Sequence, residues 1–267
     1  MRHRKAKIPI LVYHQVSELS ERTKIIRSTN PAYSLSIQQF SVQMQHLSEN
    51  GYRTLCLNEL IDYTPNRHQK GVVITFDDGW ANNYANVFPI LNKMSMTGTI
   101  FVITGFVGKD KYMAWNQLRE MSKEGISIQS HTVSHRPLPL LNVSEIMQEL
   151  YQSKKSIEAH LGLAVDFLSV PHGMISQEVI DVARNVGYRA ICTMEPGFSH
   201  TYTMPAIFKR INISDQCNLG TFEKIVQANY VAILPAIISK KIKNFTKKLL
   251  GYNNYRRIYH LRYRIEE

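Results

Sequence analysis

Short apolar runs alternate along the chain with longer segments in which apolar residues recur at helical spacing. Each run is hydrophobic on both faces, which predicts a buried strand. The predicted strands are Ile8–Tyr13, Gly71–Phe76, Thr99–Ile103, Ile126–Gln129, Phe167–Val170 and Ala190–Thr193. The predicted helices are Ser36–Asn50, Ala81–Lys93, Trp115–Lys123, Ser144–Leu161 and Ser176–Asn185. This alternation predicts an α/β fold with a parallel sheet covered by helices, and a chain of 267 residues is long enough for a closed or nearly closed barrel.

The chain beyond residue 228 has a different pattern. Ile238, Ile242, Phe245 and Leu249 share one face of a predicted helix. Lys240, Lys243 and Lys247 fall on the opposite face, and Lys241 and Lys248 flank the apolar one. Such a helix can lie on an anionic membrane surface, or it can pack its apolar face on the barrel with its lysines in water. We expect a globular domain over residues 1–228 and a basic amphipathic tail over residues 229–267.

The net charge of +11 is concentrated at the two ends of the chain. Residues 1–7 carry four basic side chains, and residues 237–267 carry nine basic and two acidic ones. The body between them is neutral, so it offers no basic surface for nucleic acid, and we predict no nucleic-acid partner. The ends are candidates for contact with anionic lipid or another polyanion, or they are solvated termini, which is the interpretation we favour for residues 1–7.

The remaining composition bears on location. The three cysteines are far apart and form neither a ligand pair nor a disulfide framework. The apolar stretch near the N-terminus is too short for a signal-peptide core, and no run of ~18 apolar residues is present. We therefore expect a cytoplasmic protein that lies peripherally on the inner membrane face.

Polar residues follow three of the predicted strands. Asp77 and Asp78 come directly after one strand, His131 follows another and precedes His135, and Pro171–Gly173 follows a third. Because the ends of parallel strands meet at one rim of a barrel, these groups are expected to converge. That convergence is a stronger signal than either the paired aspartates or the paired histidines alone.

Two imidazoles and one carboxylate, with a further position left open, are typical of a catalytic zinc site. Asp78, His131 and His135 would hold the ion, and the neighbouring Asp77 would stay free to take a proton. Taken alone, an Asp-Asp-Gly sequence is usually a turn, and two histidines four apart often lie on the surface of a helix. Together, with a strand before each motif, they predict a divalent metal site.

These motifs resemble those of the polysaccharide deacetylases of carbohydrate esterase family 4, which share a NodB-like domain. Thr75–Gly79 matches the Thr-Phe-Asp-Asp-Gly motif of that family, and His131–His135 matches its His-Ser/Thr-x-x-His motif. The resemblance spans roughly residues 8–215 and makes residues 1–228 the catalytic domain. It implies a distorted (β/α) barrel with a C-terminal basic helical tail. It also implies Asp77 as general base, and Asp78, His131 and His135 as ligands of a metal that is usually zinc.

The chain departs from the family in two places. The third motif of the family places an arginine where this chain has Ser169, and an aromatic residue where it has His172. The backbone N–H of His172, next to Pro171, can still serve the oxyanion and the substrate. The late histidine that supplies the general acid is missing from Ala206–Ile213, the stretch that corresponds to it.

An early histidine is a substitute for the missing acid. Ile10–Val16 resembles the N-terminal strand of the biofilm poly-N-acetylglucosamine deacetylases, in which the motif order is permuted and this histidine is the proton donor. We rank His14 first as general acid, His172 second and His200 third.

The resemblance implies a metal-dependent hydrolase that removes N-acetyl groups from an amino sugar of a cell-surface polysaccharide or its precursor. Two alternatives stay open: a metal-dependent O-deacetylase or other amidohydrolase, and a carbohydrate-binding protein with a decayed site. The aromatic candidates for stacking on sugar rings are Trp80, Tyr84, Tyr112 and Trp115.

Overall fold

The computed structural model describes residues 7–18, 31–62, 70–198 and 204–250. Its strands are β1 (Ile10–Tyr13), β2 (Gln15–Ser17), β3 (Ser34–Ser36), β4 (Tyr52–Thr54), β5 (Lys70–Phe76), β6 (Thr99–Val102), β7 (Ser127–Ser130), β8 (Phe167–Ser169), β9 (Ala190–Cys192), β10 (Ala206–Phe208) and β11 (Ile211–Asn212). Its α-helices are α2 (Ile37–Glu49), α3 (Leu57–Asp62), α4 (Phe88–Lys93), α5 (Trp115–Lys123), α6 (Val143–Leu161), α7 (Gln177–Val186), α8 (Leu219–Val226) and α9 (Tyr230–Leu250).

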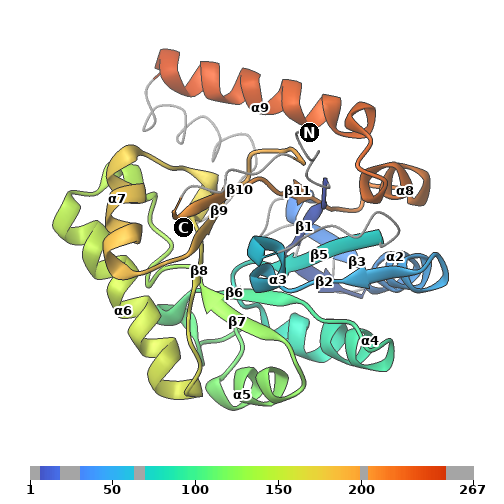
Figure 1. Ribbon diagram of the computed structural model, residues 1–267, viewed down its shortest axis with the longest axis horizontal. Helices are drawn as coiled ribbons and strands as arrows, with labels where there is room; N and C mark the ends of the chain where they lie inside the picture. Colours follow the sequence, from blue (N-terminus) through green and yellow to red (C-terminus); the bar gives the residue numbers. More distant parts are fainter. Residues whose placement is uncertain (1–6, 19–30, 63–69, 199–203, 251–267) are drawn as a thin grey trace.

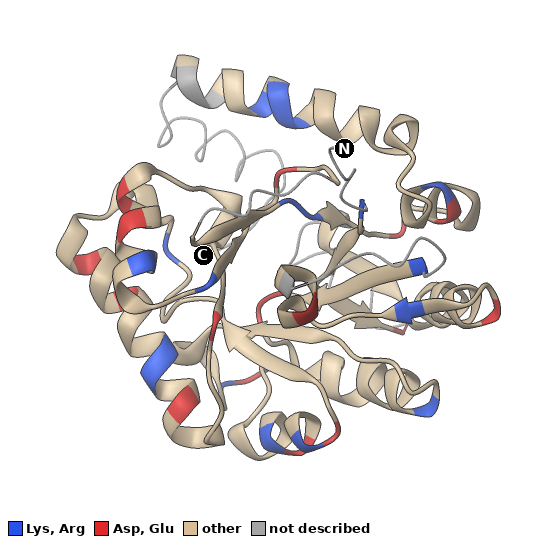
Figure 2. Cartoon of the chain, viewed as in Figure 1, with Lys and Arg blue, Asp and Glu red and all other residues tan. Residues whose placement is uncertain are grey.

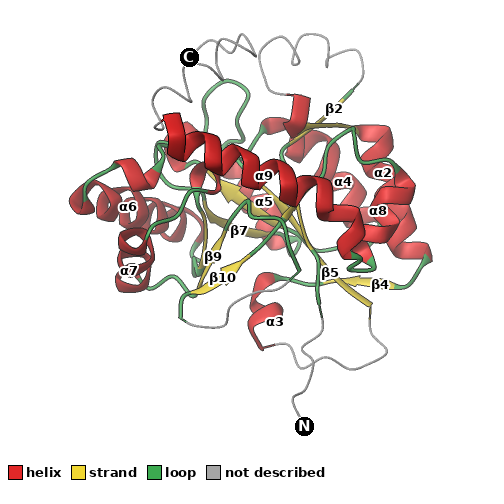
Figure 3. Ribbon diagram, turned by 90° about the horizontal axis from the view of Figure 1, so that it is seen from above, coloured by secondary structure: helices red, strands yellow, loops and turns green. Residues whose placement is uncertain are grey.

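A parallel sheet of nine strands forms the centre of the molecule (Figure 1). Its strands pair in the order β10-β9-β8-β7-β6-β5-β1-β11, and β4 adds to the start of β5. Helices surround the sheet on its outer face, as Figure 3 shows from above. The predicted α/β barrel is therefore confirmed.

The two ends of the sheet are formed by strands that follow one another in the chain. β10 and β11 are joined by Lys209 and Arg210 alone, yet the described pairing of strands does not link them directly. The barrel is thus open along a seam between them. Arg210 lies at this seam, where its side chain can enter the barrel without crossing a ladder of strand hydrogen bonds.

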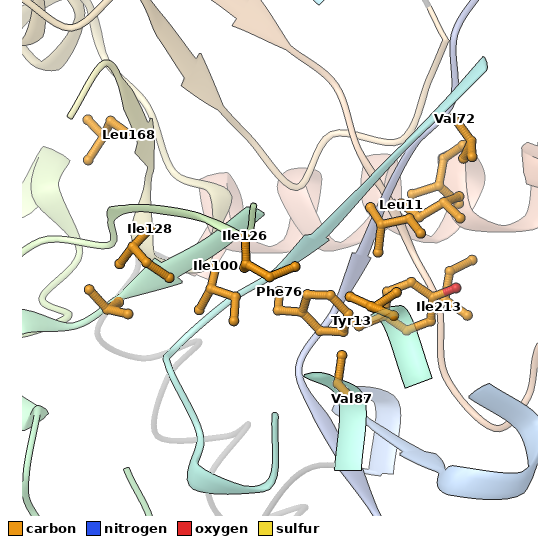
Figure 4. Close-up of a cluster of buried hydrophobic side chains, with 14 of the residues drawn as sticks. Leu11, Tyr13, Val72, Phe76, Val87, Ile100, Ile126, Ile128, Leu168 and Ile213 are labelled. Carbon is orange, nitrogen blue, oxygen red and sulfur yellow. The ribbon is translucent and has the colours of Figure 1, made fainter. Parts of the chain in front are cut away.

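Two apolar clusters lie on the two faces of the sheet. The larger one, between the sheet and its helices, contains Val72, Ile74 and Phe76 of β5 (Figure 4). The smaller one takes the intervening Val73 of β5 together with residues of β1, β6, β8, β9 and β10, so it fills the inside of the barrel. Alternation along β5 therefore continues inward through Val73 and Thr75 to Asp77, at the top of the interior.

The predicted strands all form, and most of the predicted helices end where expected. Asn142 caps α6, since its side chain accepts a hydrogen bond from the Glu145 N–H at 3.0 Å and the Glu145 carboxylate accepts one from the Asn142 N–H at 3.0 Å. The helix predicted over Ala81–Lys93 is confirmed. Inside it lies a π-helical turn, η2 (Asn83–Val87), which runs directly into α4 with Pro89 in the first turn of α4.

α9 runs along one side of the barrel beside β10 and β11 (Figure 1). Its first turns are anchored, because Ile233 is buried and Ile237 packs against the main core. The predicted boundary after residue 228 falls between the end of α8 and the start of α9, and it stays a prediction.

The alternative in which the apolar face of the tail packs on the barrel is wrong. Ile238, Ile242, Phe245 and Leu249 are 56%, 60%, 68% and 73% exposed.

Candidate metal centre and general base

Asp77 and Asp78 leave β5 in different directions. Asp77 continues the inward series of β5, is 2% exposed and donates its backbone N–H to the Tyr13 carbonyl at 3.0 Å. Asp78 has a left-handed φ of 77°, and Gly79 follows with a φ of 80°. Neighbouring residues of a regular strand point to opposite faces, so this turn is what lets both carboxylates serve one site.

The structure brings the three predicted ligands together. Oδ1 of Asp78 lies 3.4 Å from Nε2 of His131 and 3.6 Å from Nε2 of His135. One ligand atom from each residue lies within 4.8 Å of the other two. A carboxylate oxygen and two imidazole nitrogens at such spacing can close on one divalent ion, and this donor set suits zinc.

The ring of His131 is oriented by a backbone carbonyl. Its Nδ1–H donates to the Ser169 carbonyl at 2.7 Å, so the tautomer leaves the lone pair of Nε2 facing Asp78. Burial lowers the pKa of His131, but Asp77 and Asp78 outweigh it and the pKa is raised. Burial and the neighbouring His131 lower the pKa of His135 to about 3. His135 is therefore neutral and ready to coordinate near pH 7.

A buried glutamate holds the loop between the two histidines. Glu149 of α6 accepts hydrogen bonds from the backbone N–H groups of Val133 and Ser134, both at 2.9 Å, and from the Ser134 hydroxyl at 2.5 Å. Within this loop Thr132 and His135 adopt left-handed φ values of 67° and 60°. Glu149 was not among the residues predicted from the sequence, although an acidic residue beside Leu150 on the apolar face of a predicted helix was a usable signal.

Arg210 makes a bidentate ion pair with Asp77 inside the barrel. Its Nη1 lies 2.7 Å from Oδ1 of Asp77 and its Nη2 lies 2.7 Å from Oδ2. Arg210 Nη2 also donates to the Ser169 hydroxyl at 2.8 Å, and that hydroxyl donates to Asp77 Oδ2 at 3.1 Å. Arg210 is 1% exposed, so these charges meet away from water.

The arginine that the family motif places at Ser169 is therefore replaced by Arg210, from the link between β10 and β11. From the sequence we expected only that Ala206–Ile213 lacks a histidine, and its arginine was missed. An arginine inside an apolar stretch that ends a buried strand was the signal. Burial raises the pKa of Asp77, but Arg210 and His131 outweigh it, so the pKa lies below its usual value and Asp77 stays ionised.

The candidate proton donors lie in different settings. His14 directly follows β1 and is half-buried. The centroid of its ring lies 4.5 Å from that of Tyr33. Its buried Nδ1 has no hydrogen-bond partner among the described residues. Burial lowers the pKa of His14 against the opposing effect of the nearby Asp78 and Asp77.

His172 lies in the turn η5 (Pro171–Gly173) with a left-handed φ of 58°, and its side chain is exposed. The centroid of its ring lies 4.8 Å from that of His135. Pro171 is buried in the same turn. His200 lies outside the described residues.

Only two of the four candidate aromatic residues lie against the metal ligands. Trp80 donates its indole N–H to Asp78 Oδ2 at 2.9 Å and stacks on Tyr112, with ring centroids 4.7 Å apart. Tyr84 donates its hydroxyl to Glu120 of α5, and Trp115 stacks on His160 of α6. Trp80 and Tyr112 therefore lie beside the predicted ligands, and a sugar-stacking role for this pair stays a prediction.

Comparisons with known proteins agree with this geometry. Residues 64–191 match the family described as polysaccharide deacetylase. YxkH of Bacillus subtilis, a protein assigned by name to the polysaccharide deacetylases, is 32% identical over 226 residues, covering 84% of this chain and 77% of its own. The poly-beta-1,6-N-acetyl-D-glucosamine N-deacetylase of Staphylococcus aureus is 27% identical over 73% of this chain and 71% of its own.

Solved structures show the same fold. The deacetylase PplD of Streptococcus pyogenes, in complex with acetate, is 26% identical with a TM-score of 0.74, over 83% of this chain and 97% of its own. BC0361, a polysaccharide deacetylase from Bacillus cereus, is 27% identical with a TM-score of 0.73, over 82% of this chain and 68% of its own.

Proposed function

The chain belongs to the polysaccharide deacetylase family, and we propose that it is a divalent-metal hydrolase that removes N-acetyl groups from an amino sugar of a cell-surface polysaccharide or its precursor. One observation carries the proposal: Asp78, His131 and His135 can share one ion while Asp77 is held apart from them by Arg210. The likeness to a poly-β-1,6-N-acetylglucosamine deacetylase supports the choice of sugar. The cytoplasmic location, on the inner face of the membrane, stays a prediction from the sequence.

Asp78, His131 and His135 would hold the metal, and we propose zinc because two imidazoles and one carboxylate are its usual catalytic ligands. When bound, such an ion lowers the pKa of a water molecule and acts as a Lewis acid toward the amide carbonyl. The lone pairs needed for this lie at His131 Nε2, His135 Nε2 and Asp78 Oδ1.

Asp77 acts as the general base in this proposal. Its ion pair with Arg210 keeps it ionised, and its Oδ1, which takes one hydrogen bond from that arginine, keeps lone-pair capacity to accept the proton of the attacking water. The pair also fixes the carboxylate in place, which spares the reaction the cost of orienting it.

His14 donates the proton to the leaving amine. Burial lowers the pKa of His14 against the opposing charges of Asp78 and Asp77, which favours release of its proton to the amine, and its buried Nδ1 has no hydrogen-bond partner among the described residues. The backbone N–H of His172, beside Pro171, would donate to the oxyanion. We expect His14→Ala to lower turnover by about 10²–10⁴ with the metal retained. Full turnover by this variant would remove His14 from the mechanism and make His172→Ala the next test.

The experiment for the proposed function is acetate release from β-1,6-linked N-acetylglucosamine oligomers. Acetate should appear with the metal-loaded protein, stop after a chelator and return when zinc is added. O-acetylated xylan tested in parallel separates an N-deacetylase from an O-deacetylase. A protein that binds metal but releases acetate from neither substrate would contradict the proposal and favour carbohydrate binding alone.

The missing arginine of the third motif slightly favours the non-catalytic alternative, a carbohydrate-binding protein with a decayed site. Arg210 supplies a guanidinium to the carboxylate of Asp77, which weakens that reason.

A further inference from the structure

The helix α9 carries an exposed apolar stripe, formed by Val231, Leu234, Ile238, Ile242, Phe245 and Leu249. Their exposures run from 45% to 73%. At about 100° per residue these six positions fall within an arc of roughly 80° along the whole helix. Single apolar residues are common on protein surfaces, but a continuous exposed row of them indicates a surface that binds a protein, a ligand or a membrane.

The opposite face of α9 accounts for how the helix is held. Ile233 is buried, Ile237 packs on the core, and the Tyr230 ring meets that of Phe198 edge to face, with centroids 5.1 Å apart. The anchor therefore lies in the first two turns, and the stripe points away from it. The residues of the stripe are not needed to hold α9 on the barrel, because other residues of α9 make its contacts with the core.

The charges around the stripe indicate its partner. Residues 230–250 contain five lysines and no acidic residue, and Figure 2 shows basic but no acidic positions on α9. By helical spacing Lys241 and Lys248 flank the stripe on one side. The chain from residue 230 to its end carries a net charge of +7, whereas the body is neutral. An anionic lipid surface can bind both features, because its acyl chains bury the apolar row and its headgroups attract the lysines beside it.

We propose that α9 lies flat on a membrane rich in anionic lipid, with its apolar stripe in the acyl boundary and the flanking Lys241 and Lys248 at the headgroups. A second copy of the chain is a poorer partner, because two such helices would bring lysines together with no acidic residue on either to pair with them. A soluble polyanion would satisfy the lysines but leave the stripe in water.

This contact does not require α9 to cross the membrane. Among the described residues no single helix is long and apolar enough to span a bilayer. Only α8 and the first part of α9 taken together have the length and composition of a membrane span, and they are bent by 98° where they meet. In the fold Phe222, Ile225 and Val226 of α8 are buried in the main core, so α8 is not available to lipid. α9 alone, lying in the plane of the interface, fits these facts.

The test is co-sedimentation of the full chain with vesicles that mix phosphatidylglycerol with phosphatidylcholine, and with pure phosphatidylcholine vesicles as reference. We expect binding to the anionic vesicles only, weakening as salt is raised. The triple variant Ile238→Ser, Ile242→Ser, Phe245→Ser should bind more than about 100-fold more weakly, since three exposed side chains lose their burial in lipid. Lys241→Gln with Lys248→Gln should weaken binding roughly 30-fold, at about 1 kcal/mol for each lysine.

Matched controls come from the same molecule. Val143, Met147 and Tyr151 form another exposed apolar row on α6, and replacing all three with serine should leave vesicle binding unchanged. Lys93→Gln with Lys123→Gln removes two exposed lysines from α4 and α5 and should have little effect. Acetate release from a soluble oligomer should be the same in every variant, so failure of this contact and failure of the proposed function are distinguishable.

Three outcomes would overturn the proposal. The first is a wild-type chain that does not bind anionic vesicles. The second is a triple variant that binds them as well as the wild type, which would reduce the contact to charge alone. The third is a wild-type dimer in analytical ultracentrifugation that the triple variant dissociates without any vesicle binding, which would make the stripe an interface between copies.

Discussion

The rim of the barrel and the helix α9 place charged and apolar side chains in opposite environments. At the rim Asp77 and Arg210 are charged groups shut away from water, each satisfied by several hydrogen bonds. On α9 Ile242 and Phe245 are apolar groups left in water. Both arrangements are costly unless something compensates them, and the two regions differ in where the compensation lies.

At the rim the compensation is internal. The guanidinium, the Ser169 hydroxyl and Glu149 satisfy groups that would otherwise be buried without partners. On α9 nothing in the described chain covers the stripe, and we propose that lipid supplies the compensation there. Changes at the rim should therefore alter chemistry and stability together, whereas changes within the exposed stripe should alter neither.

The largest effect is expected at Asp77. Asp77→Asn should lower turnover by about 10²–10⁴, because the amide cannot take the proton from water, while the metal content stays that of the wild type. Acetate-release kinetics and metal analysis measure the two quantities. Asp181→Asn, which breaks an exposed ion pair with Arg184, is the control and should change neither. Loss of metal from the Asp77 variant would mean that both aspartates are ligands.

Arg210→Gln should lower the free energy of unfolding by about 3–5 kcal/mol, because it leaves the Asp77 carboxylate buried without its cation. Denaturant unfolding measures this. Arg184→Gln removes an arginine from an exposed pair and should cost about 0–1 kcal/mol.

The same substitution has a second signature, in the pH dependence of the rate. Arg210 holds the pKa of Asp77 below its usual value. Without it that pKa rises, so the base becomes protonated at a higher pH and the acid limb of kcat/KM moves upward. An unshifted limb in a folded variant would mean that Arg210 is structural only.

Glu149→Gln should weaken metal binding by about 10–100-fold, the usual range for residues that orient ligands. Its amide can accept fewer strong hydrogen bonds from the loop that carries His131 and His135. Metal titration of the apo protein measures the affinity. Glu158→Gln, which breaks ion pairs at the surface of the same helix, is the matched control and should leave the affinity unchanged.

The smallest effect is expected on α9. Replacing Ile238, Ile242 and Phe245 with serine should change the free energy of unfolding by no more than about 0.5 kcal/mol per site, because these side chains are already in water. Ile233→Ala on the same helix should cost about 2 kcal/mol or more, since Ile233 is 1% exposed. If the stripe substitutions lower the free energy of unfolding as much as Ile233→Ala does, the stripe contributes to the stability of the fold and its compensation is internal, as at the rim.

The fold was predictable from the sequence because its strands are buried on both faces. Such strands appear as short continuous apolar runs, as in β5 and β6, and caps such as Asn142 marked the helix ends. The short strands β10 and β11 and the π-turn inside the helix over residues 81–93 were not predictable, since two or three residues carry no periodicity and the π-turn depends on packing.

The candidate site was predictable only as far as its motifs reach. Asp78, His131 and His135 lie in two short segments whose strand contexts point to one rim. Arg210 lies 133 residues from Asp77 in the chain and reaches it at the seam. Glu149 lies 16 and 15 residues from Val133 and Ser134 and reaches them from a helix face. Their roles depend on which strands become neighbours, and local sequence does not carry that information. Whether the apolar stripe of α9 faces the barrel or the solvent was likewise not predictable, because the same amphipathic pattern occurs in helices of both kinds.

The most direct test of the central claim is zinc titration of the apo protein by calorimetry, comparing the wild type with Asp78→Asn, His131→Ala and Asp77→Asn. We predict one equivalent of zinc for the wild type, none for the Asp78 and His131 variants, and one for the Asp77 variant. A wild type that binds no zinc, or a His131 variant that binds it as well as the wild type does, would contradict this prediction.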